Sequence, residues 1–208
     1  GTAKGTAGGL LAAGTAQSLD ITEDITTTAE IANSNITANG AVSVVAQDEH
    51  QVTGKATGHS AAGFASGGLT KITTKITNTT TARATGSTIT AKNILIQATT
   101  SINKDTKATA SSGAFGGSAN DVSDDTTVNN QTYTEVGSGS KLTAIDADQD
   151  GDEIVFIAAS NNSYKGYATA IAGAIIAKGV AKATQNVTDD VRVKIYPSTI
   201  LANKGNIK

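Results

Sequence analysis

The sequence predicts an all-β chain folded as a β-solenoid, in which the strands of one coil stack on those of the next. The first observation is an internal repeat of about 55 residues that runs through the whole chain. The second is a set of short segments in which apolar and other side chains alternate, which is the period of a β-strand. The third is composition. Of 208 residues, 22 are Gly and one is Pro, which disfavours helices and leaves strand N–H groups free to pair.

A three-residue signature marks each copy of the repeat. It is an apolar residue followed by Thr and Ala in three copies, and a looser apolar pair with Ala in the fourth. The copies are Ile36-Thr37-Ala38, Ile89-Thr90-Ala91, Leu142-Thr143-Ala144 and Ile200-Leu201-Ala202. Their positions give approximate units 1–52, 53–108, 109–167 and 168–208. We interpret 1–208 as a single repeat segment and expect it to be the interior of a longer solenoid, because repeat arrays need capping units at their ends.

Each copy has the same order of elements. A Gly-rich segment of small residues comes first, a strand rich in Thr, Asp or Asn follows, and the signature and a short alternating strand close the copy. The alternating strands are 42–46, 94–98 and 154–158, and Ile207 begins a fourth. We expect Val, Ile and Ala to stack inward, and Thr, Asn and Ser to face outward or occupy turns.

Residues 166–184 leave a helix open as an alternative. The segment is rich in Ala, but Gly173 and Gly179 interrupt it, and its counterparts in the other copies contain still more Gly. Because Gly destabilises helix interiors, a strand is the favoured interpretation.

Composition and charge narrow the function classes. The chain has no Cys, which excludes disulfide scaffolds, Cys-based zinc sites and Cys nucleophiles. Its formal net charge of −2 comes with 16 scattered Lys and Arg residues, so nothing favours nucleic-acid binding. No stretch reaches the ~20 apolar residues that a membrane-spanning helix needs, and no signal peptide is seen.

The order of these elements resembles a known family. An Ala-rich Gly-Gly segment, the strand NVTDDVRVKI (186–195) and the segment ITANGAVSVVA (36–46) are similar to the repeats of filamentous haemagglutinin-like adhesins. They are most similar to leukotoxin-type large filamentous adhesins of Gram-negative anaerobes, which are two-partner-secretion exoproteins. The resemblance covers nearly the whole chain. It implies a right-handed parallel β-helix, secretion to the bacterial cell surface as a virulence factor, and export of the unfolded chain through an outer-membrane partner.

The resemblance also implies the size of the coil. At roughly 20 residues per coil, the habit of the family, the chain would form about ten coils. Stacked at the spacing of neighbouring strands, ten coils make a rod about 50 Å long.

One segment interrupts the repeat and is the candidate metal site. The third copy inserts an acidic loop around Gly151 that reads Asp-x-Asp-x-Asp-Gly, the first half of an EF-hand-type calcium loop. The candidate ligands are Asp146, Asp148, Asp150, Asp152 and Glu153. The twelfth loop position is Ile157 instead of a bidentate Glu, so the pattern predicts at most a weak extracellular calcium site. A solvated acidic loop without a ligand is the alternative. No other cofactor is expected.

Catalysis has little support in the sequence. His50 and His59 are the only two histidines, and a general base needs a partner within hydrogen-bond reach, for which Asp48 or Glu49 are the sequence neighbours. The acidic pairs 124–125 and 189–190 are interpreted as solvated turns or edges. We therefore expect no enzyme. An ice-binding Thr array and a polysaccharide-active enzyme are weaker alternatives.

The favoured function is structural and adhesive. The chain would be a β-helical segment of a secreted surface filament, with a host-cell or matrix surface as its partner. The alternative is a self-assembling extracellular filament or sheath, in which identical chains stack head to tail through uncapped coils.

Overall fold

The computed structural model describes residues 1–145, 153–202 and 207–208, and the regular elements in these residues are all strands. Thirteen strands form three sheets, and every strand pair is parallel. Sheet A contains β1 (Thr2–Gly9), β4 (Val42–Ala62), β7 (Ile94–Gly113), β10 (Ile154–Ser160) and β11 (Ser163–Gly173). Sheet B contains β2 (Ala12–Ala32), β5 (Ala65–Thr85), β8 (Gly117–Val136) and β12 (Ile176–Ile195). Sheet C contains β3 (Asn35–Thr37), β6 (Thr88–Ala91), β9 (Lys141–Ala144) and β13 (Thr199–Ala202).

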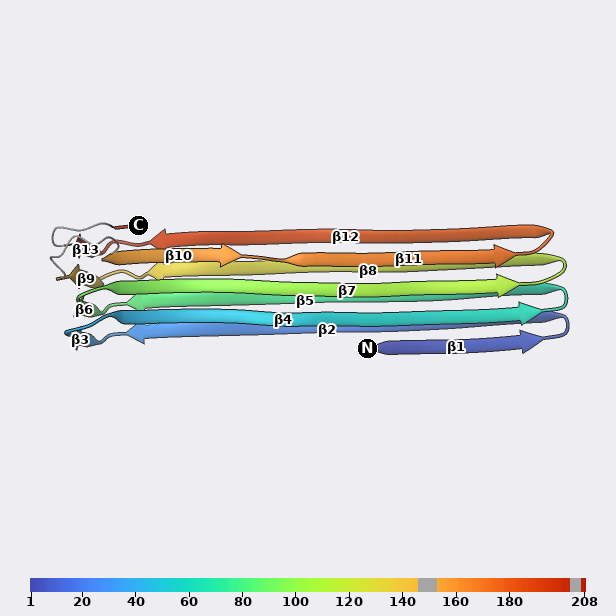
Figure 1. The fold of residues 1–208 in the computed structure, drawn as a ribbon, viewed down its shortest axis with the longest axis horizontal. Coiled ribbons are helices and arrows are strands. Elements are labelled where there is room, and N and C mark those ends of the chain that lie inside the picture. Colours follow the sequence, from blue (N-terminus) through green and yellow to red (C-terminus); the bar gives the residue numbers. More distant parts are fainter. Residues whose placement is uncertain (146–152, 203–206) are drawn as a thin grey trace.

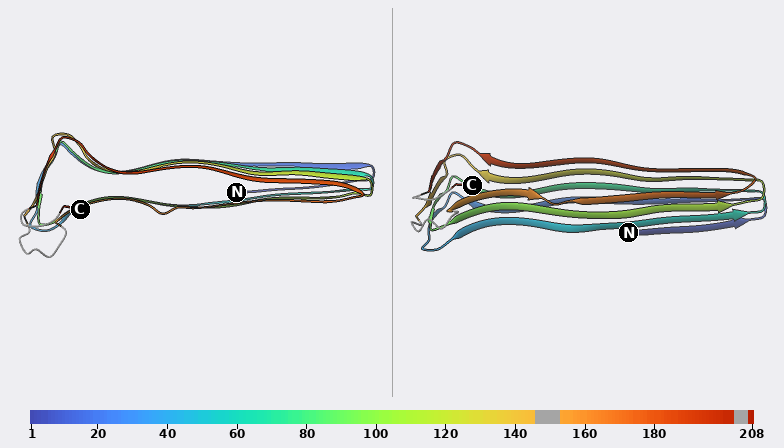
Figure 2. Two further views of the ribbon diagram at one scale, coloured as in Figure 1. Left: turned by 90° about the horizontal axis from the view of Figure 1, so that it is seen from above. Right: turned by 45° about the horizontal axis from the view of Figure 1, so that its top comes forward.

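The three sheets form a flattened solenoid. Each coil runs along a long strand of sheet A, turns, returns along a long strand of sheet B, and crosses the short sheet C before the next coil begins (Figure 1). In Figure 1 the coils advance upward, with sheet A running to the right in front of sheet B, which runs to the left. The view from above in Figure 2 shows sheets A and B as two facing layers. This path is right-handed, so the predicted fold class is confirmed.

The predicted number of coils is wrong. Thr2 pairs with Lys55, Val42 with Ile94, and Ile94 with Ile154, so each coil takes about 55 residues. The chain therefore makes about four coils of the full repeat instead of ten short ones. At about 3.3 Å per residue, the 21-residue strands β4 and β5 make each coil about 70 Å long, whereas four coils stack to only about 20 Å.

The repeat signature is confirmed as a stack of equivalent positions. Ile36 pairs with Ile89, Ile89 with Leu142, and Leu142 with Ile200 in sheet C. The segment for which a helix was the alternative lies in strands β11 and β12. Ile207 forms a parallel bridge with Ile154 and so begins another layer of sheet A, as predicted.

Glycines allow the tight turn between sheets A and B. A Cβ at Gly9 would lie 2.1 Å from the carbonyl oxygen of Ala12, and one at Gly63 would lie 2.4 Å from that of Leu10. Such distances are too short for any side chain, so the backbone closes here only because these positions are Gly. The Gly-rich segments are thus the ends of two long strands and the turn that joins them, not the corners of a short coil.

A left-handed residue makes the corner between sheets B and C. Asn33, Gly86 and Gly139 occupy this corner in three successive coils, with φ of 48°, 56° and 76°. Asn and Gly are the residues that adopt this conformation most readily. A positive φ thus recurs at this corner in each of the three coils.

The core lies between the two long sheets and is thin. Its largest apolar cluster lies near sheet C and includes Ile89, Ile94, Ile96 and Leu142, all at most 1 % exposed. Two smaller clusters follow along the length of the coil, around Ile76 and around Ile72. The expectation that Thr, Asn and Ser all face outward is wrong. Residues of these types lie buried between the apolar clusters, and they include Thr70, Thr74, Asn78, Thr80, Thr100, Thr106, Asn120, Thr126, Asn130, Thr132 and Thr134.

Candidate functional site

The acidic loop chosen from the sequence lies mainly outside the described residues. Asp146, Asp148, Asp150 and Asp152 belong to the segment 146–152, so the calcium site stays a prediction. Glu153 is described: it is 1 % exposed and its carbonyl oxygen accepts a hydrogen bond from the Ile94 N–H at 2.7 Å. Among the residues that the structure describes, no group of three or more His, Asp or Glu side chains is arranged to hold a metal ion.

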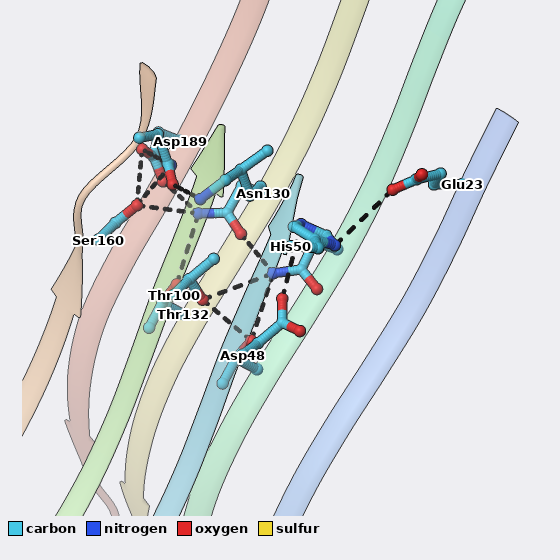
Figure 3. A network of polar contacts seen from close by, with 12 residues as sticks. Glu23, Asp48, His50, Thr100, Asn130, Thr132, Ser160 and Asp189 are labelled. Carbon is cyan, nitrogen blue, oxygen red and sulfur yellow. Dashed lines mark hydrogen bonds and ion pairs between the residues drawn. The ribbon is translucent and has the colours of Figure 1, made fainter. Parts of the chain in front are cut away.

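The most distinctive polar feature is a column of side chains at one level of the core, which is buried at Asn78 and Asn130 and exposed at Asp189 (Figure 3). It follows the paired positions Ile25, Asn78, Asn130 and Asp189 of sheet B. Asn78 Nδ2 donates to Asn130 Oδ1 at 2.8 Å, and Asn130 Nδ2 donates to Asp189 Oδ1 at 2.6 Å. The amides of successive coils are thus joined head to tail along the solenoid axis.

Sheet A supplies the other half of this column. Thr100 of β7 faces the two Asn residues, and its hydroxyl lies 2.9 Å from those of both Thr80 and Thr132. One coil further on, Ser160 Oγ and Asn162 Nδ2 donate to Asp189 Oδ2 at 3.1 and 2.9 Å. These hydrogen bonds join the two long sheets at this level, and they run from the buried Asn78 and Asn130 to Asp189, which is exposed.

A histidine lies between two carboxylates in the neighbouring coil. His50 Nδ1 is 3.7 Å from Glu23 Oε2, and His50 Nε2 is 3.7 Å from Asp48 Oδ2. These distances are too long for hydrogen bonds and describe charge contacts that operate when the imidazole is protonated. The two ring nitrogens contact two different carboxylates, and among the described residues the three side chains are not arranged to hold a metal ion.

A second buried polar cluster joins β7 to β8. Lys104 Nζ donates to Asp124 Oδ1 at 3.3 Å, and both side chains are fully buried. The second carboxylate oxygen accepts from Thr106 Oγ1 at 2.6 Å and from the Tyr167 N–H at 3.1 Å. Burial lowers the pKa of Lys104, while Asp124 acts in the opposite direction and favours the ammonium form.

The interpretation of the acidic pairs as solvated turns or edges is wrong for Asp124, which is fully buried, whereas Asp189 is exposed on β12, the last strand in the order of sheet B. Asp124 and Asp189 face the core from the middle of β8 and β12, and each has specific partners there. Asp125 and Asp190 are the outward-facing neighbours. Asp190 accepts a hydrogen bond from Tyr133 Oη at 2.7 Å, which is the main reason that its pKa is lowered.

The other histidine lies on the outer face of sheet A. His59 Nδ1 is 2.5 Å from Ser111 Oγ, its paired position in the next coil. A serine and a histidine in contact are two of the three parts of a nucleophilic site, which also needs a group that orients the imidazole. The described contacts of His59 include no such group.

A row of exposed apolar side chains marks the turns between sheets A and B. We call it the apolar edge: Leu10, Leu11, Phe64, Phe115, Ile175 and Ile176, which are between 64 % and 87 % exposed. A groove of about 520 Å³ lies along it, with Phe64, Phe115 and Ile175 among its lining residues. Contiguous exposed apolar surface on a folded chain is unusual and marks a contact surface.

Sequence reasoning missed the buried clusters, although a signal for one of them is present. Asn78 and Asn130 are 52 residues apart and fall at the same place in successive repeats, so aligning the copies would have predicted an Asn ladder. The Lys104–Asp124 pair has no such signal, because its members lie on opposite sheets.

Comparisons with protein-family models, curated proteins and solved structures found no match to this chain. Among the described residues there is also no helix long and apolar enough to cross a membrane.

Proposed function

We propose that this chain is a structural and adhesive β-solenoid segment of a secreted bacterial surface filament. The single observation that carries the proposal is the parallel register by which all three sheets pair equivalent strands of successive coils. Parallel backbone ladders that continue from coil to coil hold the long strands of each coil in a fixed arrangement, which gives a stiff body about 70 Å across. The buried pairs Asn78–Asn130, Thr100–Thr132 and Lys104–Asp124 bond to each other inside the core, which supports a scaffold instead of a substrate site.

Secretion and export belong to the same proposal. The absence of Cys from the sequence suits a chain that crosses an outer-membrane pore unfolded, because a disulfide formed earlier would obstruct passage. The partners would be that export pore and then a host-cell or matrix surface.

Labelling of intact bacteria that express the protein tests this proposal. Gold-tagged antibodies against residues 1–208 are expected to decorate extracellular filaments or the outer surface without permeabilisation. Beads coated with the folded chain are expected to bind epithelial cells or matrix proteins more than beads coated with the urea-unfolded chain. Labelling confined to permeabilised cells would contradict the proposal.

A second candidate is a protomer of a self-assembling extracellular filament. It is favoured by the ion pairs that join successive coils on the outer face of sheet B, Arg83 to Glu30 at 2.9 Å and Lys194 to Glu135 at 3.3 Å, because the same kind of contact can join coils of different copies.

A further inference from the structure

The apolar edge lies at the end of the coil opposite sheet C, where each long strand of sheet A turns into sheet B (Figure 1). Phe64 and Phe115 belong to the second and third coils, and they are 64 % and 72 % exposed although a coil is stacked on either side of each. A further coil at either end of the stack would therefore leave them uncovered. Their exposure is a property of the turn itself.

The chain on both sides of each of these turns is uncharged over a long stretch. The stretches 5–19, 56–70, 108–120 and 166–177 contain no Lys, Arg, Asp or Glu, and each of them spans one turn of the apolar edge. The large apolar side chains at the turns have Gly or Ala as close neighbours in the sequence. An apolar ridge with uncharged sides thus recurs in every copy of the repeat.

Most of the charged residues that bound these stretches are basic. They are Lys4, Lys55, Lys107 and Lys165 before the turns, and Asp20, Lys71, Asp121 and Lys178 after them. All eight residues are exposed, and six Lys with two Asp give them a net charge of +4. The whole chain has a formal net charge of −2. The apolar edge is therefore flanked by positive charge on a chain that is slightly acidic.

The backbone of the turns is hydrogen-bonded from coil to coil. The N–H groups of Gly116 and Gly117 donate to the carbonyl oxygen of Phe64 at 3.0 and 2.9 Å. One coil further on, the carbonyl oxygen of Gly116 accepts from the N–H of Ile176 at 3.1 Å. A backbone whose polar groups are already paired can enter hydrocarbon at a much lower cost than an ordinary loop.

The shape of the apolar edge favours lipid over a protein partner. Each coil contributes one tight turn, so the ridge is only about as wide as the spacing of two packed sheets, about 10 Å, however many coils are stacked. A stable protein interface buries a broader patch of about 800 Å² on each partner. Lipid chains surround a projecting side chain from all sides, so a narrow ridge gains burial for every Phe, Leu or Ile that it inserts.

We propose that the apolar edge inserts into the surface of a lipid bilayer that contains anionic lipids, with Phe64 and Phe115 as anchors. The proposal rests on the cell-binding scaffold proposed above and names the part of the cell surface that the chain contacts. Lys55 and Lys107 are paired in register on sheet A, about 20 Å from the turn at about 3.3 Å per residue. If the turns enter the bilayer by about 5–10 Å, these flexible cations come within about one Debye length, about 8 Å, of the headgroups.

Flotation of the folded 208-residue chain with vesicles of phosphatidylcholine and phosphatidylserine tests the proposal. We expect binding at about 50 mM NaCl that weakens at about 500 mM, because salt screens the Lys side chains. Phe64→Ser with Phe115→Ser should weaken binding at least about tenfold, because two anchors are lost. The matched control is Val45→Ser with Leu201→Ser, two exposed apolar residues elsewhere, which should bind within about twofold of the unmodified chain.

The basic residues near the apolar edge are tested in the same assay. Lys55→Gln with Lys107→Gln should weaken binding to these vesicles at least about threefold, since each Lys near an anionic surface contributes attraction. The matched control, Lys92→Gln with Lys141→Gln, removes the same charge from exposed residues beside sheet C. This control should change binding by less than about twofold, because these side chains stay far from the bilayer.

A single Trp reports directly on insertion, because the chain contains none. Phe115→Trp should emit at shorter wavelength when vesicles are added, and lipids brominated on their acyl chains should quench it. Val45→Trp lies on sheet A outside the apolar edge and should show neither change. Circular dichroism of every variant first establishes that it is folded.

Three results would overturn insertion of the apolar edge. The first is a folded chain that does not float with the vesicles. The second is equal quenching of Phe115→Trp and Val45→Trp, or binding that is unaffected by Phe64→Ser with Phe115→Ser. The third is self-association in place of vesicle binding, lost in the same Phe variant, which would make a second copy of the chain the partner. Surface labelling that persists without vesicle binding would leave the adhesive scaffold standing, so the two failures can be told apart.

Discussion

Lys104 and Asp124 face each other across the core from two different sheets, and their energetics differ from those of a surface ion pair. Both side chains are fully buried, so each depends on the other and on the donors Thr106 and Tyr167 to replace lost water. A pair of this kind specifies which residues of β7 and β8 lie opposite each other more than it adds stability.

Removing the ammonium group of Lys104 alone should therefore lower the stability strongly. Lys104→Met leaves a buried carboxylate without its counter-ion, and we expect the free energy of unfolding to fall by about 3–5 kcal/mol. Lys104→Met combined with Asp124→Asn should recover much of this loss, because the Asn side chain still accepts from Thr106 and carries no charge. Urea unfolding measures both. The exposed ion pair gives the control: Arg83→Gln should cost less than about 1 kcal/mol. A loss below about 1 kcal/mol for Lys104→Met would contradict the structure.

The phenol of Tyr164 makes the stability sensitive to alkaline pH. Burial and the nearby carboxylate of Asp189 raise its pKa to about 12, whereas an unfolded tyrosine titrates near 10. The folded state therefore holds this proton more tightly. Its contribution to stability is complete below about pH 10 and is lost as the pH rises from about 10 to about 12. Urea unfolding between pH 8 and pH 11.5 should show a steeper decline for the unmodified chain than for Tyr164→Phe, and parallel curves would contradict the assignment.

At the scale of the element, the corner between sheets B and C depends on one backbone conformation. Gly139 adopts φ of 76° with open space around the position of a Cβ, so a substitution there tests strain without a steric clash. Gly139→Val should lower the free energy of unfolding by about 1–2 kcal/mol. Gly139→Asn should cost clearly less, because Asn33 already adopts this conformation in the first coil. An equal loss of unfolding free energy in the two variants would contradict the requirement for a left-handed conformation at position 139.

The sequence was sufficient to predict the strand pairing of sheet C but not the length of the coil. Signature residues such as Ile36 and Ile89 repeat at the coil period, so position alone predicted the pairing that sheet C shows. The predicted length of the coil was wrong because it was taken from the family that the sequence resembles instead of from the repeat of about 55 residues, which is the coil itself. A run of Gly, Ala and Thr has no apolar alternation, so local pattern could not show that it continues a strand of 21 residues.

The burial of the polar residues could not be predicted from the sequence for a different reason. Asn78 and Thr100 meet across the core, and so do Lys104 and Asp124, although the members of each pair are well separated in sequence and lie on opposite sheets. Which residues oppose each other depends on where the turn falls, and a shift of one residue would turn every side chain to the other face. Local polarity suggested outward positions for Asn78 and Asp124, whereas tertiary pairing places them inside.

At the scale of the whole molecule, the apolar edge is the largest departure from an ordinary soluble surface. Phe64 and Phe115 are 64 % and 72 % exposed, so replacing both with Ser removes little packing. We expect Phe64→Ser with Phe115→Ser to reduce the fluorescence of bound anilinonaphthalene sulfonate at least about twofold, while the melting temperature changes by less than about 4 °C. The control is Val45→Ser with Leu201→Ser, two exposed apolar residues elsewhere, which should leave the fluorescence nearly unchanged. A similar decrease in both variants would contradict a localised apolar edge.

The width of the coil has a mechanical consequence. A chain that takes about 55 residues for each strand spacing of about 4.8 Å advances only about 0.09 Å per residue along its axis. The chain is therefore wide across the solenoid axis and short along it, and a stack of such coils has a flat, elongated cross-section. Bending resistance grows with the cube of the dimension in the plane of bending. A stack of these coils should consequently flex easily across its thin dimension and resist flexing across its broad one, so that thermal motion curls it into a ribbon confined largely to one plane.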